Sequence, residues 1–322
     1  MTDTEAALYK NRRGGLIFFG LVEMAIGGLC LLLVALMTFS FFVAANTPRA
    51  GVPDLQFRQM FMSLSVYLLG GVLMVTLGVG SMLARRWARD LSLIVAWMWM
   101  FVGVITAATM IVLVPRFMPR MPADQAQTGT IVLTCLTIVF SFFGVVVPLA
   151  LILFYRSPNV RATCIALDPH PRWTERAPLP LLALALWTLF GAVTMMTISA
   201  YAVLPLGRQI ITGPLAILAY CALGLFMLYL SWGLYTRTRV AWWLGIAYGA
   251  LTAIYCVVVF PRIDYDKLVG AMHMPKTPGM PDLGDIYRSP WFLAYLAFFW
   301  LLYFGYFAFV YRYFRESNAA SS

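Results

Sequence analysis

The chain has 322 residues, of which 62% are hydrophobic and only 11% are charged, and its formal net charge at pH 7 is +10. A soluble domain is closer to half apolar and a quarter charged, so a water-soluble fold is excluded and membrane lipids must surround most of the chain. Nucleic acid is excluded as a partner, because the basic residues flank apolar segments and no zinc-finger, RNA-binding or basic-helix pattern occurs.

Eight apolar segments are long enough to cross a bilayer as helices, which takes about 20 residues each. The first is too long for the core of a signal peptide, so we expect it to be a retained membrane helix. We predict an all-α integral membrane protein with eight transmembrane helices, at residues 14–45, 59–84, 87–114, 130–155, 179–206, 212–236, 240–260 and 290–314.

The basic residues predict the orientation of these helices. If the N-terminus is cytoplasmic, 14 of the 23 Lys and Arg residues lie in inner segments and 9 in outer ones. Four of those nine fall in the longest loop, residues 261–289, and long loops count less toward orientation. We therefore place both termini in the cytoplasm. The absence of an N-x-S/T sequon fits a bacterial inner (plasma) membrane protein.

Three short sequences recur in the same order in the two halves of the chain. They are Arg85–Arg89 and Arg237–Ala241, Val114-Pro115-Arg116 and Phe260-Pro261-Arg262, and Phe154-Tyr155-Arg156 and Val310-Tyr311-Arg312. Because four helices bring each half to the same orientation, the pattern predicts two four-helix units related by a parallel pseudo-repeat. The expected units are residues 1–157 and 179–322, joined by a cytoplasmic linker at residues 158–178.

The linker contains a predicted short helix. Ser157 and Pro158 form a typical N-cap and first-turn pair. Val160, Cys164 and Leu167 follow at helical spacing, which favours a helix lying on the inner membrane surface. The prolines that come next end this helix.

Two membrane segments carry packing signals. Small residues recur every four positions in the seventh segment, which predicts a stripe where another helix approaches closely; they are Ala241, Gly245, Gly249 and Ala253. Pro148 is expected to bend the fourth helix. The eighth segment is crowded with aromatic residues, best explained by lipid contact, although Tyr303 and Tyr306 need hydroxyl partners at depth.

Glu23 is the only acidic residue well inside an apolar segment, roughly 13 Å from its start at 1.5 Å per residue. A carboxyl group there is expensive, and two interpretations stay open. Glu23 is either a proton or transport site, or a structural carboxyl bonded to a neighbouring helix. Asp90 instead adjoins Arg86 and Arg89 at the inner boundary, which predicts a local ion pair.

No catalytic residue, cofactor or metal site is predicted. The sequence has no H-E-x-x-H, Walker A, G-x-S-x-G or G-x-G-x-x-G motif, and its five cysteines include no C-x-x-C pair. His170 and His273 both lie in predicted loops, which excludes a bis-histidine haem site in the bundle. A Cu(I) site in the outer loops is an alternative, but methionine is abundant in the whole chain and also fills loops packed on a membrane surface. The site would use Met118, Met121, Met272, His273, Met274 and Met280.

The sequence favours a non-catalytic membrane protein, such as an accessory or scaffold subunit with partner subunits in the membrane. The alternative is a small-solute or proton-coupled transporter with its site between the two four-helix halves, involving Glu23. A third interpretation is a membrane enzyme acting on lipid. The arginine-rich inner turns suit lipid headgroups, but no acid–base pair is evident beside them.

Overall fold

The structure, a computed structural model, describes residues 10–46, 54–117, 123–272, 284 and 287–314, and of residues 44–45, 54–63, 112–117 and 123–126 it describes the backbone only. Eight helices in these ranges are long and apolar enough to cross a membrane, which confirms the predicted all-α multi-pass integral membrane protein. The spans are Arg13–Val43, Leu64–Met82, Arg86–Ile111, Gln127–Tyr155, Leu179–Tyr201, Pro214–Tyr235, Arg239–Arg262 and Pro290–Phe314.

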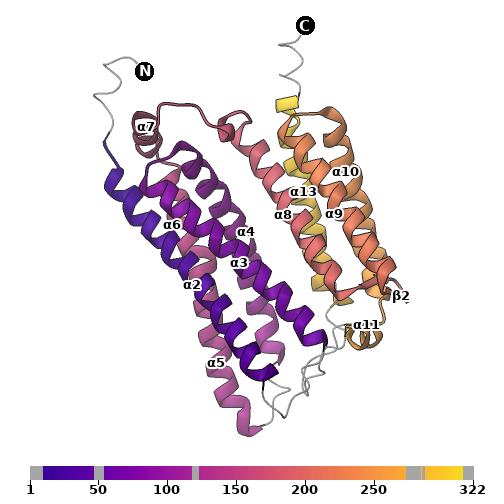
Figure 1. Ribbon diagram of the computed structural model, residues 1–322. Coiled ribbons are helices and arrows are strands. Elements are labelled where there is room, and N and C mark those ends of the chain that lie inside the picture. Colours follow the sequence, from indigo (N-terminus) through magenta and orange to yellow (C-terminus); the bar gives the residue numbers. More distant parts are fainter. Residues whose placement is uncertain (1–9, 47–53, 118–122, 273–283, 285–286, 315–322) are drawn as a thin grey trace. The chain divides into compact units, whose positions relative to one another are not determined.

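The chain forms two compact units, each with its own core. Unit 1 comprises Met1–Val52 and Ser63–Leu179, and unit 2 comprises Pro53–Met62 and Pro180–Ser322. The linker residues 158–178 fall within unit 1. In Figure 1 the helices of unit 1 run from indigo to magenta, and those of unit 2 run from salmon to yellow.

Four long antiparallel segments and a short terminal helix build unit 1, except that residues 54–62, the start of the second segment, are grouped with unit 2. They are α2 (Arg13–Ala45), α3 (Asp54–Met82), α4 (Arg86–Phe117), the continuous run of α5 (Ala123–Ser141), η2 (Phe142–Val146) and α6 (Val147–Tyr155), and then α7 (Pro158–Leu167), followed by the single turn η3 (Trp173–Glu175). The core comprises Leu16, Ala84, Leu93, Ala96, Leu151, Ile152, Tyr155, Val160 and Cys164. Pro148 lies two residues after the end of the π-helical turn η2, where the missing proline N–H is accommodated.

The helix α7 begins and ends where the sequence predicts. Ser157 is its N-cap, and Val160 and Cys164, which are 0% and 1% exposed, pack in the core of unit 1. Leu167, the last residue of α7, is 47% exposed. The placement of α7 on the inner membrane surface stays a prediction.

Close packing of α2 on α3 depends on glycine. A Cβ atom added to Gly78 would lie 2.5 Å from the carbonyl oxygen of Gly20 and 2.6 Å from Met24 Cγ. One added to Gly27 would lie 2.8 Å from the carbonyl oxygen of Gly71. The two backbones therefore touch along this stripe, which is how helices associate where no hydrophobic effect drives them together.

Unit 2 contains four membrane helices and a small hairpin. The helices are α8 (Leu179–Ile198), α9 (Pro214–Tyr235), α10 (Arg239–Ile254) and α13 (Pro290–Val310), and shorter elements are η4 (Ser199–Tyr201), η5 (Tyr255–Val259), η6 (Phe260–Arg262) and α11 (Tyr265–Ala271). Their core comprises Leu181, Leu184, Ala185, Leu230, Leu234, Ala241, Trp242, Phe307, Val310 and Phe314.

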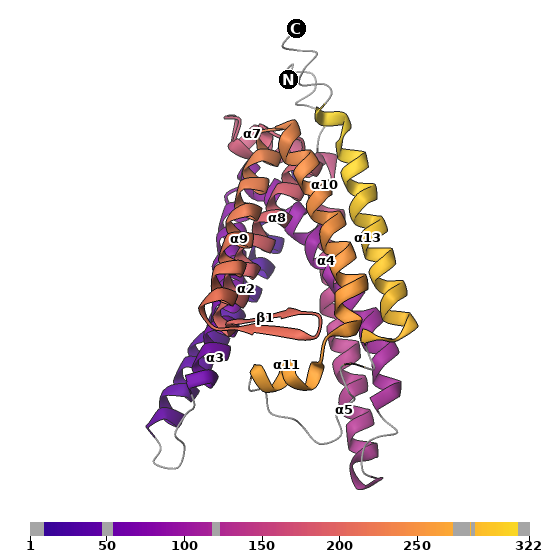
Figure 2. The same cartoon turned by 90° about the vertical axis from the view of Figure 1, so that its right-hand side faces the viewer.

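The predicted fifth helix is wrong in its last residues, which form a strand. The strands β1 (Val203–Leu206) and β2 (Gln209–Thr212) pair antiparallel, with Leu206 opposite Gln209. Gly207 takes the first loop position with a φ of 64°, which suits a two-residue hairpin turn. Ala202, with a left-handed φ of 54°, ends the preceding helical turn. In Figure 2 the hairpin lies beside α11, and the two are in contact.

The small-residue stripe of α10 packs against α13, as predicted. A Cβ atom added to Gly245 would lie 2.5 Å from the ring of Phe307, and Gly249 faces the ring of Tyr303. The two tyrosine hydroxyl groups predicted to lie deep in the eighth segment both have hydrogen-bond acceptors. Tyr303 donates to Gly245 O at 2.8 Å, and Tyr306 donates to Pro180 O at 2.8 Å.

Two helix-ending turns share one backbone geometry. Ala84, after α3, and Arg237, after α9, have left-handed φ angles of 52° and 61°. In each turn the next amide donates to a glycine carbonyl in the last helical turn: Arg85 N to Gly80 O at 2.9 Å, and Thr238 N to Gly233 O at 2.8 Å. A left-handed residue at this place satisfies carbonyl groups that the helix end leaves unpaired.

Candidate functional site

The predicted site residue Glu23 lies in the interior of unit 1. Its side chain is 2% exposed, and Ser81 of α3 donates a hydrogen bond to its Oε2 atom at 3.2 Å. Tyr155, at the end of α6, donates in turn to Ser81 Oγ at 2.8 Å. Three helices are therefore joined through one carboxyl group, a hydroxyl and a phenol. The role of Glu23 as a proton or transport site stays a prediction.

Ser92 of α4 adds a fourth polar side chain to this cluster. It is 2% exposed and adjoins both Glu23 and Tyr155. Its hydroxyl oxygen has no hydrogen-bond partner among the residues that the structure describes. We call Glu23, Ser81, Ser92 and Tyr155 the carboxyl cluster. Sequence reasoning missed the last three, because a serine or tyrosine in an apolar segment gives no sign of which helix it meets.

A second polar group lies next to the carboxyl cluster, at the end of unit 1 where α4 begins. Arg89 donates from Nε to the backbone oxygen of Tyr155 at 3.2 Å and from Nη1 to Asp90 Oδ1 at 2.8 Å. The predicted ion pair of Asp90 is thus confirmed, with Arg89 as its partner. Asp90 is 6% exposed, and Thr174 donates to its other oxygen at 3.2 Å.

Arg86 pairs with a different acid, which the sequence did not indicate. Its Nε atom lies 2.7 Å from Glu175 Oε1, although the N–H does not point at that oxygen. Glu175 belongs to η3, so this ion pair and the Thr174–Asp90 bond hold the linker against the start of α4. Both contacts join residues more than 80 positions apart.

Asp168 caps the start of α4 from the linker. Its Oδ2 atom accepts the backbone N–H of Arg86 at 3.4 Å, which satisfies one of the amides that a helix start leaves free. Arg172 donates to both of its oxygens, at 2.8 and 3.2 Å. These bonds, that of Arg172 first, hold the pKa of Asp168 below its ordinary value, so the carboxylate is charged at neutral pH.

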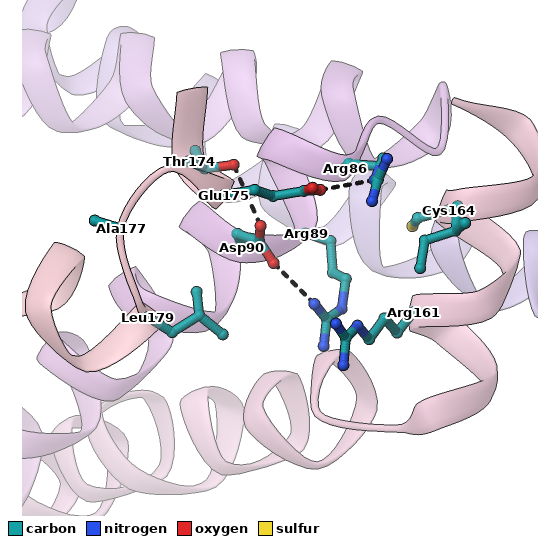
Figure 3. Close-up of a pocket in the computed structure, with 10 residues that line it drawn as sticks. Arg86, Arg89, Asp90, Arg161, Cys164, Thr174, Glu175, Ala177 and Leu179 are labelled. Carbon is teal, nitrogen blue, oxygen red and sulfur yellow. Dashed lines mark hydrogen bonds and ion pairs between the residues drawn. The ribbon is translucent and has the colours of Figure 1, made fainter. Parts of the chain in front are cut away.

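These contacts enclose a pocket of about 330 Å³. Its lining comprises Arg86, Arg89, Asp90, Arg161, Cys164, Ile165, Thr174, Glu175, Ala177 and Leu179. Figure 3 shows the side chains converging from α4, from α7 and from the segment around η3. Burial raises the pKa of Cys164 to about 11, so this thiol stays protonated and unreactive at neutral pH. We call this the arginine pocket.

The described residues hold no group of three or more His, Cys, Asp or Glu side chains arranged to bind a metal ion. His170 lies in the linker and is exposed. Of the residues considered for copper, Met272 is the C-cap of α11, while Met118, Met121, His273, Met274 and Met280 fall outside the described ranges.

Comparison with known protein families, characterised proteins and solved structures finds no match for this chain. The site must therefore be interpreted from its own geometry.

Proposed function

We propose that this chain is a non-catalytic multi-pass membrane protein, acting as an accessory or scaffold subunit. The observation that carries the proposal is the carboxyl cluster. Glu23 is shielded from solvent and joined through Ser81 and Tyr155 to two other helices, as expected of a carboxyl group that holds helices together. The charged groups next to it are likewise engaged in bonds that hold the linker on α4.

Replacing Glu23 tests this proposal. A glutamine amide can accept the same bond from Ser81 without titrating, so we expect Glu23→Gln to fold with nearly unchanged stability. Glu23→Ala leaves the hydroxyl of Ser81 without its acceptor and should lower the free energy of unfolding by about 1–3 kcal/mol. Unfolding of the purified protein in detergent measures both changes.

The functional part of the test needs native membranes. Under the proposal, a partner membrane protein co-purifies with the tagged chain after mild detergent extraction, equally with wild type and Glu23→Gln. Proton uptake into proteoliposomes that Glu23→Gln abolishes would contradict the proposal.

A proton-coupled transporter is the second candidate, and Ser92 is the observation that favours it. The Ser92 hydroxyl is buried beside the intramembrane carboxyl group of Glu23 and makes no close hydrogen bond within the described residues, so it is available to a proton or cation that Glu23 would hold. Ser92→Ala discriminates between the two. If the carboxyl cluster is purely structural, Ser92→Ala removes an unsatisfied polar group and leaves the stability of the protein unchanged or raises it. If the cluster is an ion site, Ser92→Ala weakens proton or cation coupling.

We also propose that the two halves derive from one duplicated four-helix unit. Support comes from the turns after α3 and α9, in which the residue with a left-handed φ angle and the amide bonded to a glycine carbonyl occupy corresponding positions. The spacing from glycine to left-handed residue to alanine is the same in both: Gly80, Ala84 and Ala88, and Gly233, Arg237 and Ala241. Placement in a bacterial inner membrane with cytoplasmic termini is part of the same proposal and rests on the distribution of basic residues.

A further inference from the structure

The arginine pocket carries one more cation than its acids balance. Arg89 pairs with Asp90, and Arg86 pairs with Glu175. The third arginine, Arg161 of α7, has an exposed side chain that forms no hydrogen bond or close ion pair within the described residues, and its charge acts on Asp90 only at longer range. The pocket therefore has a net positive charge.

Arg161 reaches into this pocket from α7 and Arg89 from α4, and the charges of both act on Asp90 (Figure 3). Two like charges at short range repel, and an anion between them replaces that repulsion with attraction. Arg89 uses Nε and Nη1 within the protein, so its second terminal nitrogen keeps free N–H donors.

We propose that the arginine pocket binds a phosphate group, with Arg161 and Arg89 donating to its oxygens. The planar guanidinium group matches two phosphate oxygens at once, and arginine is the side chain best suited to such recognition. A volume of about 330 Å³ accommodates the phosphate and part of the group attached to it.

The site is built before any ligand arrives. Arg89 is held by the Tyr155 carbonyl and by Asp90, and its side chain is only 11% exposed. The Asp168 cap and the Thr174–Asp90 bond fix the linker that forms the opposite wall. Binding therefore requires ordering of Arg161 alone, which limits the entropic cost.

The position of the pocket defines two sources for the phosphate. Arg86 and Leu179 line the pocket and are also the first residues of two membrane spans, so the site lies at the depth of lipid headgroups. Ile165, Ala177 and Leu179 give it apolar surface beside the cations. The ligand is the phosphate of an anionic lipid headgroup or of a free phosphate compound, and experiment separates the two.

The test compares two arginines five residues apart. Arg161→Gln removes the unpaired cation, and Arg156→Gln removes an exposed cation that does not line the pocket. Thermal unfolding of the full-length protein in neutral detergent is followed against inorganic phosphate at constant ionic strength. Parallel titrations use short-chain phosphatidylglycerol and the corresponding phosphate-free diacylglycerol. A ligand of the folded state raises the unfolding temperature with concentration.

We expect a phosphate-bearing probe to stabilise wild type and Arg156→Gln alike, and the apparent affinity of Arg161→Gln to be about tenfold lower or more. Arg161→Lys keeps the charge but loses the paired guanidinium donors, so its apparent affinity should lie between those of wild type and Arg161→Gln. Stabilisation by phosphatidylglycerol alone identifies a lipid headgroup, and stabilisation by inorganic phosphate identifies a free compound. An equal loss of apparent affinity in Arg161→Gln and Arg156→Gln, or no stabilisation of wild type by either phosphate-bearing probe, would overturn the proposal.

Discussion

At the scale of single residues, Asp168 shows how much one carboxylate organises. It accepts bonds from Arg172 and from the backbone of Arg86, and Arg85 lies 3.8 Å away, although its own side chain is only 2% exposed. One acid thus caps a membrane helix and anchors the linker at the same time. Removing this carboxylate would leave the start of α4 without its cap and the linker without its anchor.

The lowered pKa of Asp168 predicts a pH dependence of stability. A carboxyl group whose pKa is lower in the folded state stabilises the fold above its unfolded pKa, and that contribution is lost as the pH falls through the folded pKa. We expect Asp168→Asn to be less stable than wild type at neutral pH, and this difference to shrink below about pH 4. Unfolding of both proteins in detergent across this pH range measures it. A difference that stays constant with pH would show that the charge is irrelevant.

At the scale of elements, the contact of α2 with α3 is set by glycines on both helices. Gly78 and Gly20 bring the two backbones together, one helical turn from the Ser81 hydroxyl that binds Glu23. The carboxyl cluster therefore depends on this close approach. A wider separation of the two helices would break the bond between Ser81 and Glu23.

The glycines of α3 provide a matched pair of substitutions. In Gly78→Ala the added methyl meets the backbone of α2, and forcing such contacts costs about 1–3 kcal/mol. In Gly70→Ala the methyl meets no atom within 4 Å, so the variant should be neutral or up to about 1 kcal/mol more stable. Denaturant unfolding in mixed micelles compares them. Equal stability of the two variants would contradict the close packing.

At the scale of the whole molecule, the lipid-facing surface and the polar segments have opposite chemistry. The membrane helices expose large apolar side chains outward, among them Leu153 at 67%, Leu251 at 69% and Leu301 at 72%. Such surface is tolerable only when lipid covers it. We therefore expect the turn of the hairpin and the linker to lie outside the bilayer.

The predicted orientation places these two segments on opposite sides of the membrane. A membrane-impermeant thiol reagent applied to intact cells should label Arg208→Cys in the hairpin turn, and should label His170→Cys in the linker only after permeabilisation. The parent protein, with its five native cysteines, is the control for background labelling. Labelling of His170→Cys in intact cells would reverse the orientation.

Much of this molecule follows from local sequence. The eight spans, the start of α7 at Pro158 and the pairing of Asp90 with its neighbour Arg89 all depend on residues close together in the chain. In lipid each segment must satisfy its own backbone hydrogen bonds, so a long apolar stretch has to be a helix. The strand at Val203–Leu206 was not predicted, because its residues are as apolar as the end of a membrane helix would be.

Most contacts between helices were decided only by the tertiary structure. Ser81 is 58 residues from Glu23, Tyr155 is 74 from Ser81, and Asp168 is 82 from the amide that it caps. Which side chains meet across such distances depends on how each helix is rotated about its axis. In a soluble protein the apolar stripe reveals that rotation, but a membrane helix is apolar on every face, and only the fit of small residues and the need to satisfy buried polar groups select it.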